Sequence, residues 1–242
     1  MHVRLSTVLL VGMLTLAVVA SAAELPKKYG IELRGGYGMA AMEDVNNMTD
    51  TLWGNGRTTG TKPDGSPSFG LSLLYRTHQN FQWEFGYNSL GMSRFESENS
   101  VTKKMSTMDV KGSEFYIMPT FRWDITEAIS WGIGAGPNFC FASATRSGDM
   151  SDLNFPEANG RTIGGMAKIF AEIGLGESNG IHLSAGYRDH YVDRVRWEDA
   201  DGNKTVVTIS PSNTLNLPID YSGAFFQVGW RFYYQPKPWK AE

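Results

Sequence analysis

The segment at residues 224–234, close to the end of the 242-residue chain, alternates between two kinds of side chain. Its even positions, from Ala224 to Tyr234, are all apolar or aromatic, whereas its odd positions include Gln227 and Arg231. Because successive side chains of a β-strand point to opposite faces, the pattern predicts a strand with one apolar and one polar face. Such a strand suits lipid on one side and a polar lumen on the other.

The same alternation recurs along the chain, without a convincing helical period. It predicts eight strands, near 29–42, 67–76, 80–94, 107–123, 127–144, 161–176, 180–198 and 221–234. Short turns at 76–79, 124–127 and 177–180 alternate with long polar loops at 43–66, 95–106, 145–160 and 199–220. This alternation is typical of outer-membrane barrels, in which the short turns face the periplasm. We therefore predict an all-β fold, an eight-stranded antiparallel up-and-down transmembrane β-barrel with both termini in the periplasm.

The first 23 residues have the pattern of a secretory signal peptide. Arg4 supplies the positive charge, residues 8–19 the apolar stretch and residues 20–22 the small-residue cleavage site. An uncleaved anchor is the alternative, but the apolar run is shorter than the roughly 20 residues of a membrane-spanning helix. The predicted organisation is a signal peptide at 1–23, a barrel at 24–234 and a short periplasmic tail at 235–242.

The composition excludes several classes of protein. A net charge of −3 gives no basic surface for nucleic acid, so no nucleic-acid partner is expected. Cys140 is the only cysteine, which excludes an internal disulfide and a thiolate metal cluster. A mean hydropathy of −0.28 argues against a helical membrane protein but is compatible with a barrel that has a polar interior. No metal and no cofactor is predicted.

Aromatic side chains of the apolar face gather at the predicted periplasmic ends of the strands. They would form a girdle at one membrane interface. The girdle consists of Tyr75, Phe81, Trp83, Phe121, Trp123, Trp131, Trp230, Phe232 and Tyr234. The alternative is a secreted β-sandwich or lipocalin-like barrel with its apolar face turned inward, which needs no such girdle.

The polar face carries charges of both signs, which a narrow lumen can hold only if they are paired. We expect a structural network that comprises Glu32, Arg34, Glu84, Glu114, Lys168, Glu172, His182, Arg188 and Arg231. Glu32 near the start of the first strand and Arg231 near the end of the last should be neighbours once the barrel closes. The alternative role is the selectivity lining of a pore, but eight strands leave little room beyond the side chains themselves.

With its signal peptide, its loop pattern and the terminal Phe226-x-Val228-Gly229-x-Arg231-Phe232, the mature chain resembles the OmpX, OmpW and opacity-protein group. These are eight-stranded, porin-like outer-membrane proteins of Gram-negative bacteria. The terminal strand resembles the signal read by the barrel-assembly machinery, although Tyr233, Tyr234 and the tail displace the usual terminal aromatic residue. The resemblance implies the cell outer membrane as location, with its lipid and lipopolysaccharide as partners.

One pair of residues raises the question of enzymatic activity. His182 and Ser184 are similar to the His-x-Ser pair of the lipid A deacylase barrels, but the Asn that follows Ser in that family is Ala185 here. Both residues also lie on the inward face, away from lipid. We predict no enzyme, but a barrel whose surface loops serve envelope integrity, adhesion or binding of an extracellular partner. A narrow passive channel for small or apolar solutes is the alternative, and a lipid-modifying enzyme is the third candidate.

Overall fold

The computed structural model describes residues 28–39, 65–98, 105–126, 128–148, 157–175, 178–198, 204–206, 208–210, 213–216 and 218–234. The predicted signal peptide at 1–23, nearly all of the first long loop at 43–66 and the tail at 235–242 lie outside these residues. No helix in the described part of the chain is long and apolar enough to cross a membrane.

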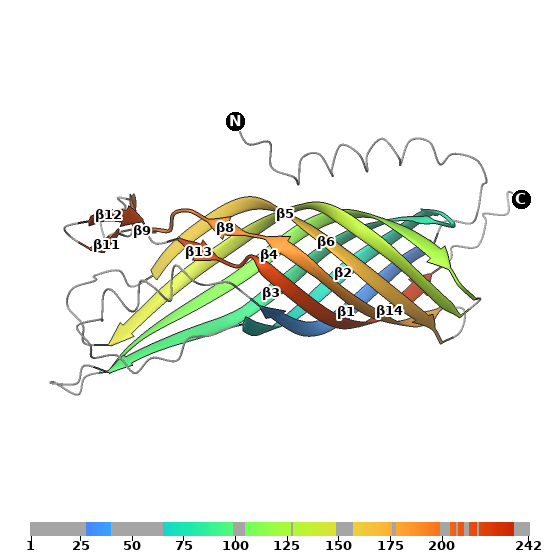
Figure 1. Ribbon diagram of the computed structural model, residues 1–242, viewed down its shortest axis with the longest axis horizontal. Helices are drawn as coiled ribbons and strands as arrows, with labels where there is room; N and C mark the ends of the chain where they lie inside the picture. Colours follow the sequence, from blue (N-terminus) through green and yellow to red (C-terminus); the bar gives the residue numbers. More distant parts are fainter. Residues whose placement is uncertain are drawn as a thin grey trace, which may run out of the picture.

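Eight antiparallel strands close into a barrel (Figure 1), which confirms the predicted fold class. The wall consists of β1 (Lys28–Met39), β2 (Gly65–His78), β3 (Phe81–Glu98), β4 (Met105–Asp124), β5 (Ile129–Gly148), β6 (Glu157–Gly174), β7 (Asn179–Asp189) and β14 (Gly223–Tyr234). Each strand pairs with the next along the chain, and β14 pairs with both β7 and β1. In the β1–β14 ladder that closes the barrel, Glu32 lies opposite Arg231, so the first and last strands are neighbours.

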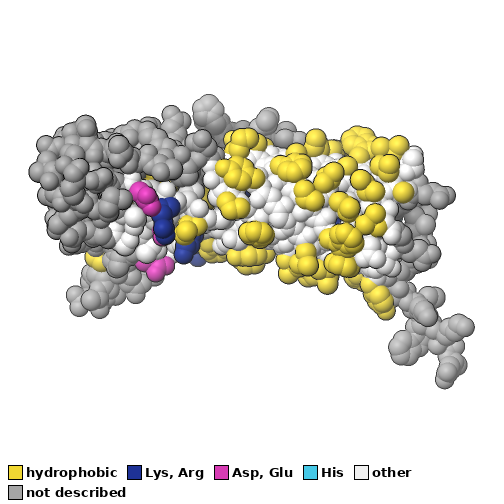
Figure 2. Space-filling model, turned by 90° about the horizontal axis from the view of Figure 1, so that it is seen from below, with side chains coloured by type: hydrophobic (Ala, Val, Ile, Leu, Met, Phe, Trp, Pro, Cys, Tyr) yellow, Lys and Arg dark blue, Asp and Glu magenta, His cyan; other side chains and the backbone are white. Residues whose placement is uncertain are grey.

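Alternation assigns opposite chemistry to the two faces of this wall. Apolar side chains on the outer face are widely exposed, for example Ile169 at 62% and Leu33 at 55%, and they form a broad band across the face that Figure 2 shows. The inner face holds charged and polar side chains that are almost completely buried. Exposed apolar groups around a buried polar interior are the arrangement expected of a barrel in lipid.

Four neighbouring strands are much longer than the other four. β3, β4, β5 and β6 have 18 to 20 residues, whereas β1, β2, β7 and β14 have 11 to 14. The predicted loops 95–106 and 145–160 were therefore too long, because strand pairing continues into both of them and leaves only 99–104 and 149–156 between strands. The long strands project past the rest of the barrel at one end (Figure 1).

A bulge in β3 changes which side chains face inward. Ser89 pairs with Ser113 and Met92 with Lys111, so β3 contains one more residue than β4 between these two pairs. Gly91 sits in the bulge with φ of 78°, a conformation that glycine adopts without strain. In β3, residues with even numbers face inward up to Leu90, and residues with odd numbers face inward from Ser93 on. Phe95 therefore faces inward and is only 1% exposed.

The predicted strand 180–198 is not continuous. β7 ends at Asp189, and the chain then forms β8 (Tyr191–Val192) and β9 (Arg196–Glu198), which pair with β13 (Ile219–Asp220) and with the outer end of β6. Gly160 of β6 permits this path, because a Cβ there would meet the side chains of Val192 and Val195. The predicted loop 199–220 is also partly ordered, with β10 (Lys204–Val206), β11 (Thr208–Ser210), β12 (Asn213–Asn216) and β13.

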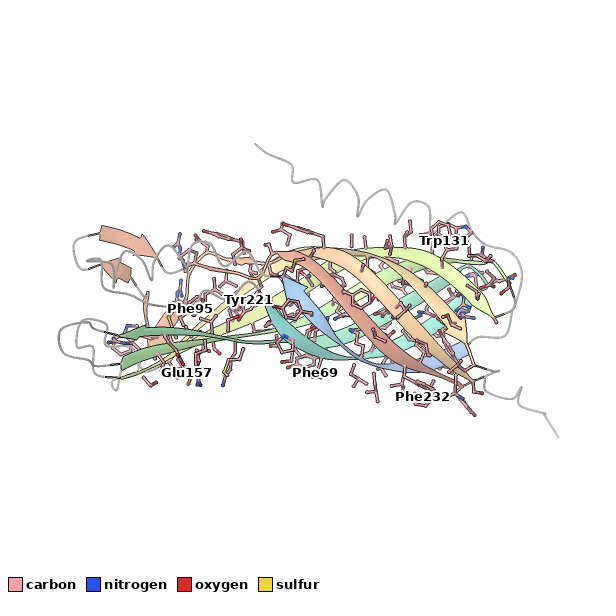
Figure 3. All side chains as sticks on the ribbon, turned by 60° about the horizontal axis from the view of Figure 1, so that its bottom comes forward. Phe69, Phe95, Trp131, Glu157, Tyr221 and Phe232 are labelled. Carbon is pink, nitrogen blue, oxygen red and sulfur yellow. The ribbon has the colours of Figure 1, made fainter. Side chains whose placement is uncertain are left out.

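We call the projecting part the extension, which comprises residues 92–98, 105–113, 142–148 and 157–162 of β3–β6 together with 190–197 and 218–222. The remaining parts of the eight barrel strands form the shaft. Phe95 and Glu157 lie in the extension, whereas Trp131 and Phe232 lie at the opposite end of the shaft (Figure 3).

Candidate functional site

The lumen of the shaft contains all nine charged residues that the sequence singled out, and every one is buried. They come from six of the eight barrel strands, because each strand turns alternate side chains inward. Four are carboxylates, four are Lys or Arg, and the ninth is His182, so the fixed charges balance. The contacts form four centres, each built around one glutamate.

Glu172 forms the centre nearest the short turns. Its Oε2 accepts hydrogen bonds from Arg231 Nη1 at 2.8 Å and from the hydroxyl of Tyr233 at 2.8 Å. Arg122 Nη1 approaches the same oxygen at 3.3 Å. Tyr233 and Arg122 were not among the predicted network residues, although both occupy inward positions of the alternation.

Glu32 forms the second centre. Arg231 Nε donates to Glu32 Oε2 at 2.6 Å, which confirms that the first and last strands bring these two charges within ion-pair distance. Arg34 Nη1 lies 3.3 Å from Glu32 Oε1. His182 Nδ1 lies 3.2 Å from the same oxygen, but without the alignment of a hydrogen bond.

Glu84 has the largest number of partners. Lys168 Nζ contacts both carboxylate oxygens at 2.8 Å, and Arg34 Nη1 contacts Oε1 at 3.0 Å. The hydroxyl of Tyr116 donates to the same carboxylate, and Arg231 Nη2 lies 3.5 Å from it. Arg231 thus touches three glutamates and joins the first three centres.

Tyr116 was also missed as a network residue, and a neighbouring glycine accounts for its position. A Cβ at Gly86, which pairs with Tyr116 across the β3–β4 ladder, would collide with the tyrosine ring. The missing side chain lets the ring cross the lumen towards Glu84, with the guanidinium of Arg34 stacked 5.1 Å from the ring centre. The inward parity of Tyr116 between Phe115 and Ile117 was the available sequence signal.

Glu114 forms the fourth centre, at the boundary with the extension. Asn88 Nδ2 donates to Glu114 Oε1 at 2.6 Å, and Arg188 Nη1 lies 3.3 Å from the same oxygen. His190 Nε2 lies 3.1 Å from Oε2. Asn88 also accepts a 2.9 Å hydrogen bond from Arg34 Nε, so this centre is connected to the other three.

Beyond Glu114 the lumen turns apolar. A cluster of buried side chains occupies the interior of the extension and the adjoining end of the shaft, and we call it the plug. It comprises Leu90, Phe95, Met108, Val110, Cys140, Ala142, Ala144, Ala158, Val192, Val195, Ile219 and Tyr221. The segments at 190–197 and 218–222 complete the plug. They contribute four of its side chains, Val192, Val195, Ile219 and Tyr221, which pack against those of the long strands. The alternation of the sequence did not predict the plug.

The pair His182 and Ser184 lies inside this filled lumen, with exposures of 0% and 2%. The ring of His182 packs 5.2 Å from that of Phe170 and faces the carboxylate of Glu32. No hydrogen bond connects Ser184 Oγ to another described residue. The described contacts therefore show no base positioned to activate this serine.

The residues of the predicted girdle lie near the short turns, and seven of the nine form ring contacts with another member on the outside of the shaft. Trp123 stacks on Trp131 with ring centres 4.8 Å apart. Phe81 differs from the others, because it is only 7% exposed and its ring packs edge-on against Trp83 and Phe121. Trp131 and Phe232 lie at the same end of the barrel (Figure 3).

Comparison with known proteins identifies the fold and nothing finer. No protein-family model matches the sequence, and no curated protein matches it. A major outer membrane protein of Thermus thermophilus has a similar structure, with a TM-score of 0.51 and 10% identity over 87% of this chain and 100% of that one. OprG of Pseudomonas aeruginosa aligns with a TM-score of 0.48 and 12% identity, over 89% of this chain and 99% of OprG. Ail, the attachment invasion locus protein of Yersinia pestis, aligns with a TM-score of 0.45 and 12% identity, over 87% of this chain and 100% of Ail. The chain thus has the fold of the eight-stranded outer-membrane β-barrels.

Proposed function

We propose that this protein is a closed outer-membrane barrel that acts through its outward-facing extension and surface loops. It neither conducts solutes nor catalyses a covalent reaction. The observation that carries the proposal is that buried side chains occupy the lumen, as paired charges in the shaft and as the plug in the extension.

The outer surface supports the membrane placement. On β6, outward positions from Ile173 to Ile163 are apolar or glycine, and the next ones outward are Arg161, Asn159 and Glu157. On β5 the corresponding change follows Phe141, which pairs with Arg161. A hydrophobic band that stops at one level on neighbouring strands is what a membrane boundary requires. The extension would then project into water.

The short turns set the proposed orientation. Barrels of this kind have short periplasmic turns and long outer loops, so the short turns and residues 28 and 234 would face the periplasm. The extension and the connections 40–64, 99–104, 149–156 and 199–217 would face the exterior. Long connections on a rigid scaffold are the usual place for partner recognition, which supports roles in adhesion, envelope integrity or binding of an extracellular ligand.

The interior supports the absence of transport. A barrel of eight strands is just wide enough for its own side chains. Here Arg34, Lys168 and Arg231 cross that space and end on carboxylates, with side chains about 1% exposed. Opening a path would separate buried ion pairs, at a cost of about 3–5 kcal/mol for each broken pair. The narrow channel is therefore the less favoured function.

Planar-bilayer recording of the purified, refolded protein tests this closure. We expect at most rare, small openings in the wild type and in the control variant Phe69→Ala, whose side chain is 68% exposed on the outer face. Steady conductance that changes with Arg188→Gln or Lys168→Gln, but not with Phe69→Ala, would establish the channel and overturn the proposal.

Labelling of intact cells with a membrane-impermeant maleimide tests the orientation. Asn159→Cys lies on the extension, and Ile125→Cys lies in a short turn where Ile125 is 65% exposed. Cys140 is completely buried and should stay unlabelled. We expect labelling at 159 and none at 125. The reverse result would show that the barrel has the opposite orientation in the membrane.

A further inference from the structure

A cleft opens on the outside of the extension, between the outer end of β6 and the segment that leaves β7. Its volume is about 990 Å³, and it is lined by three arginines, three aromatic residues and two acids among others. These residues are Arg161, Arg194, Arg196, Phe141, Tyr191, Trp197, Glu157 and Asp193. The network and the plug use none of the three arginines, and the cleft is large enough for a small-molecule headgroup.

The cleft lies at a defined height on the barrel. Arg161 pairs with Phe141 across the β5–β6 ladder, and Ile163 with Phe139. Ile163 is 66% exposed and Phe139 45%, so these side chains belong to the lipid-facing band, and Arg161 is the next outward position of β6. Two residues of a strand rise by about 7 Å, which places the guanidinium of Arg161 at headgroup level if the band lies in hydrocarbon.

Three arginines against two acids give the lining of the cleft an excess of positive charge, and two of the arginines have no ion-pair partner among the described residues. Arg194 Nε donates to Asp193 Oδ2 at 3.0 Å, and the nearby Asn159 Nδ2 lies 3.5 Å from Glu157 Oε1. Arg161 and Arg196 are exposed, and no ion pair connects either of them to another described residue. The guanidinium group binds phosphate oxygens with two parallel hydrogen bonds, which a lysine does not reproduce.

We infer that this cleft binds the phosphorylated headgroup of an outer-leaflet glycolipid, with Arg161 and Arg196 holding the phosphate. Phe141 and Tyr191 provide apolar surface where the first acyl carbons leave the headgroup, as aromatic residues do at membrane interfaces. The inference rests on the proposed orientation, because only the outward-facing leaflet meets this end of the barrel.

Native mass spectrometry of the refolded protein, released from micelles that contain diphosphorylated lipid A, tests the inference. The wild type should retain the lipid. The double variant Arg161→Gln/Arg196→Gln should bind it at least about tenfold more weakly, since each substitution removes charge-assisted hydrogen bonds. Arg161→Lys/Arg196→Lys should fall between the two, because charge remains while the paired hydrogen bonds are lost.

Arg94→Gln is the matched control. Arg94 is an exposed arginine of the extension outside the cleft, and its loss should leave lipid retention unchanged. Folding of each variant is verified by its mobility in unheated gel samples. Equal retention by the wild type and the folded double variant would overturn the inference. Equal retention of dephosphorylated lipid A would overturn it as well.

The binding measurement uses purified protein, so it does not depend on orientation in the cell. If residue 159 is labelled but the wild type and the folded double variant retain lipid A equally, the lipid site is refuted and the proposed function stands. Labelling at 125 would remove the proposed function, whatever the micelle experiment shows.

Discussion

The four long strands β3–β6 run through both the shaft and the extension, but their hydrophobic patterns are opposite in the two regions. In the shaft, Ile169 faces outward and Lys168 inward; in the extension, Asn159 faces outward and Ala158 inward. β4 reverses in the same way. In the shaft, Phe115 faces outward and Glu114 inward, whereas in the extension the exposed outward residue is Lys111 and the buried inward residue is Val110. The apolar face therefore lies wherever water is excluded, and it changes sides where lipid gives way to water.

The reversal means that different forces hold the two regions together. In the shaft, lipid covers the apolar surface, so burial inside cannot drive packing and the lumen depends on paired charges and hydrogen bonds. In the proposed placement, water surrounds the wall of the extension, so the plug would be stabilised by the hydrophobic effect as in a soluble protein. The plug also seals the lumen at its outer end.

The largest effect should come from breaking the shaft network at Arg231. Arg231→Met removes the cation that Glu32, Glu172 and Glu84 share, so the remaining partners no longer balance these buried carboxylates, and we expect the free energy of unfolding to fall by about 5 kcal/mol. Urea titration of the protein in lipid vesicles, followed by circular dichroism, measures it. Adding Glu32→Gln should restore part of the loss. If Arg231→Met unfolds like the wild type, the network does not stabilise the shaft.

A somewhat smaller effect should come from the plug. Phe95→Ala removes a ring that is 1% exposed and should cost about 3 kcal/mol, with faster proteolysis in the extension than in the shaft. Lys111→Ala, whose side chain is exposed on the outer face of the extension, is the control and should cost much less. An equal cost for both would show that the extension has no soluble-type core.

The outward face of β6 allows a direct comparison of lysine on the two sides of the boundary. Ile169→Lys places a charge against lipid and should cost about 2 kcal/mol, whereas Asn159→Lys should leave the unfolding free energy nearly unchanged. The same urea titration measures both. A comparable cost at the two positions would mean that the outer surface of β6 meets one medium throughout.

The smallest effect should come from an exposed ion pair of the extension. Arg94 Nε lies 2.8 Å from Asp109 Oδ1, and this hydrogen bond holds the pKa of Asp109 below its ordinary value. A lowered folded-state pKa contributes stability above the unfolded pKa, and that contribution is lost as the pH falls through the folded value. Arg94→Gln should therefore lower the free energy of unfolding at neutral pH by an amount close to the resolution limit of the titration. In acid, the variant and the wild type should be equally stable. A large effect at pH 7 would contradict the account of a solvated surface there.

The alternation was enough to predict the shaft from the sequence. It gave the strand number, the inward position of each charged residue and the pairing of Glu32 with Arg231, because a closed barrel makes the first and last strands neighbours. It did not give the partners inside the lumen. Those depend on long side chains that reach across the barrel, such as Arg231 to Glu84, and on gaps such as Gly86 that let Tyr116 enter.

The extension was missed because its pattern reverses within single strands. Met108 and Val110 have the same parity as Glu114, and a single alternation applied to all of β4 treats them as members of a polar face. In β3 the bulge at Gly91 adds a change of parity that hides Phe95. A search for a change in the phase of the alternation, rather than for alternation alone, would have detected the reversal in β4.

A depth scan along the outer face of β6 tests the reversal most directly. Single cysteines at 169, 163, 161, 159 and 157, in a Cys140→Ala background, would carry nitroxide labels in the protein refolded into vesicles. Power saturation then compares their access to oxygen, which concentrates in lipid, with their access to a water-soluble nickel complex. We expect oxygen to dominate at 169 and 163 and nickel at 161, 159 and 157. Oxygen-dominated labels at 159 and 157 would place the extension in the membrane and contradict the account.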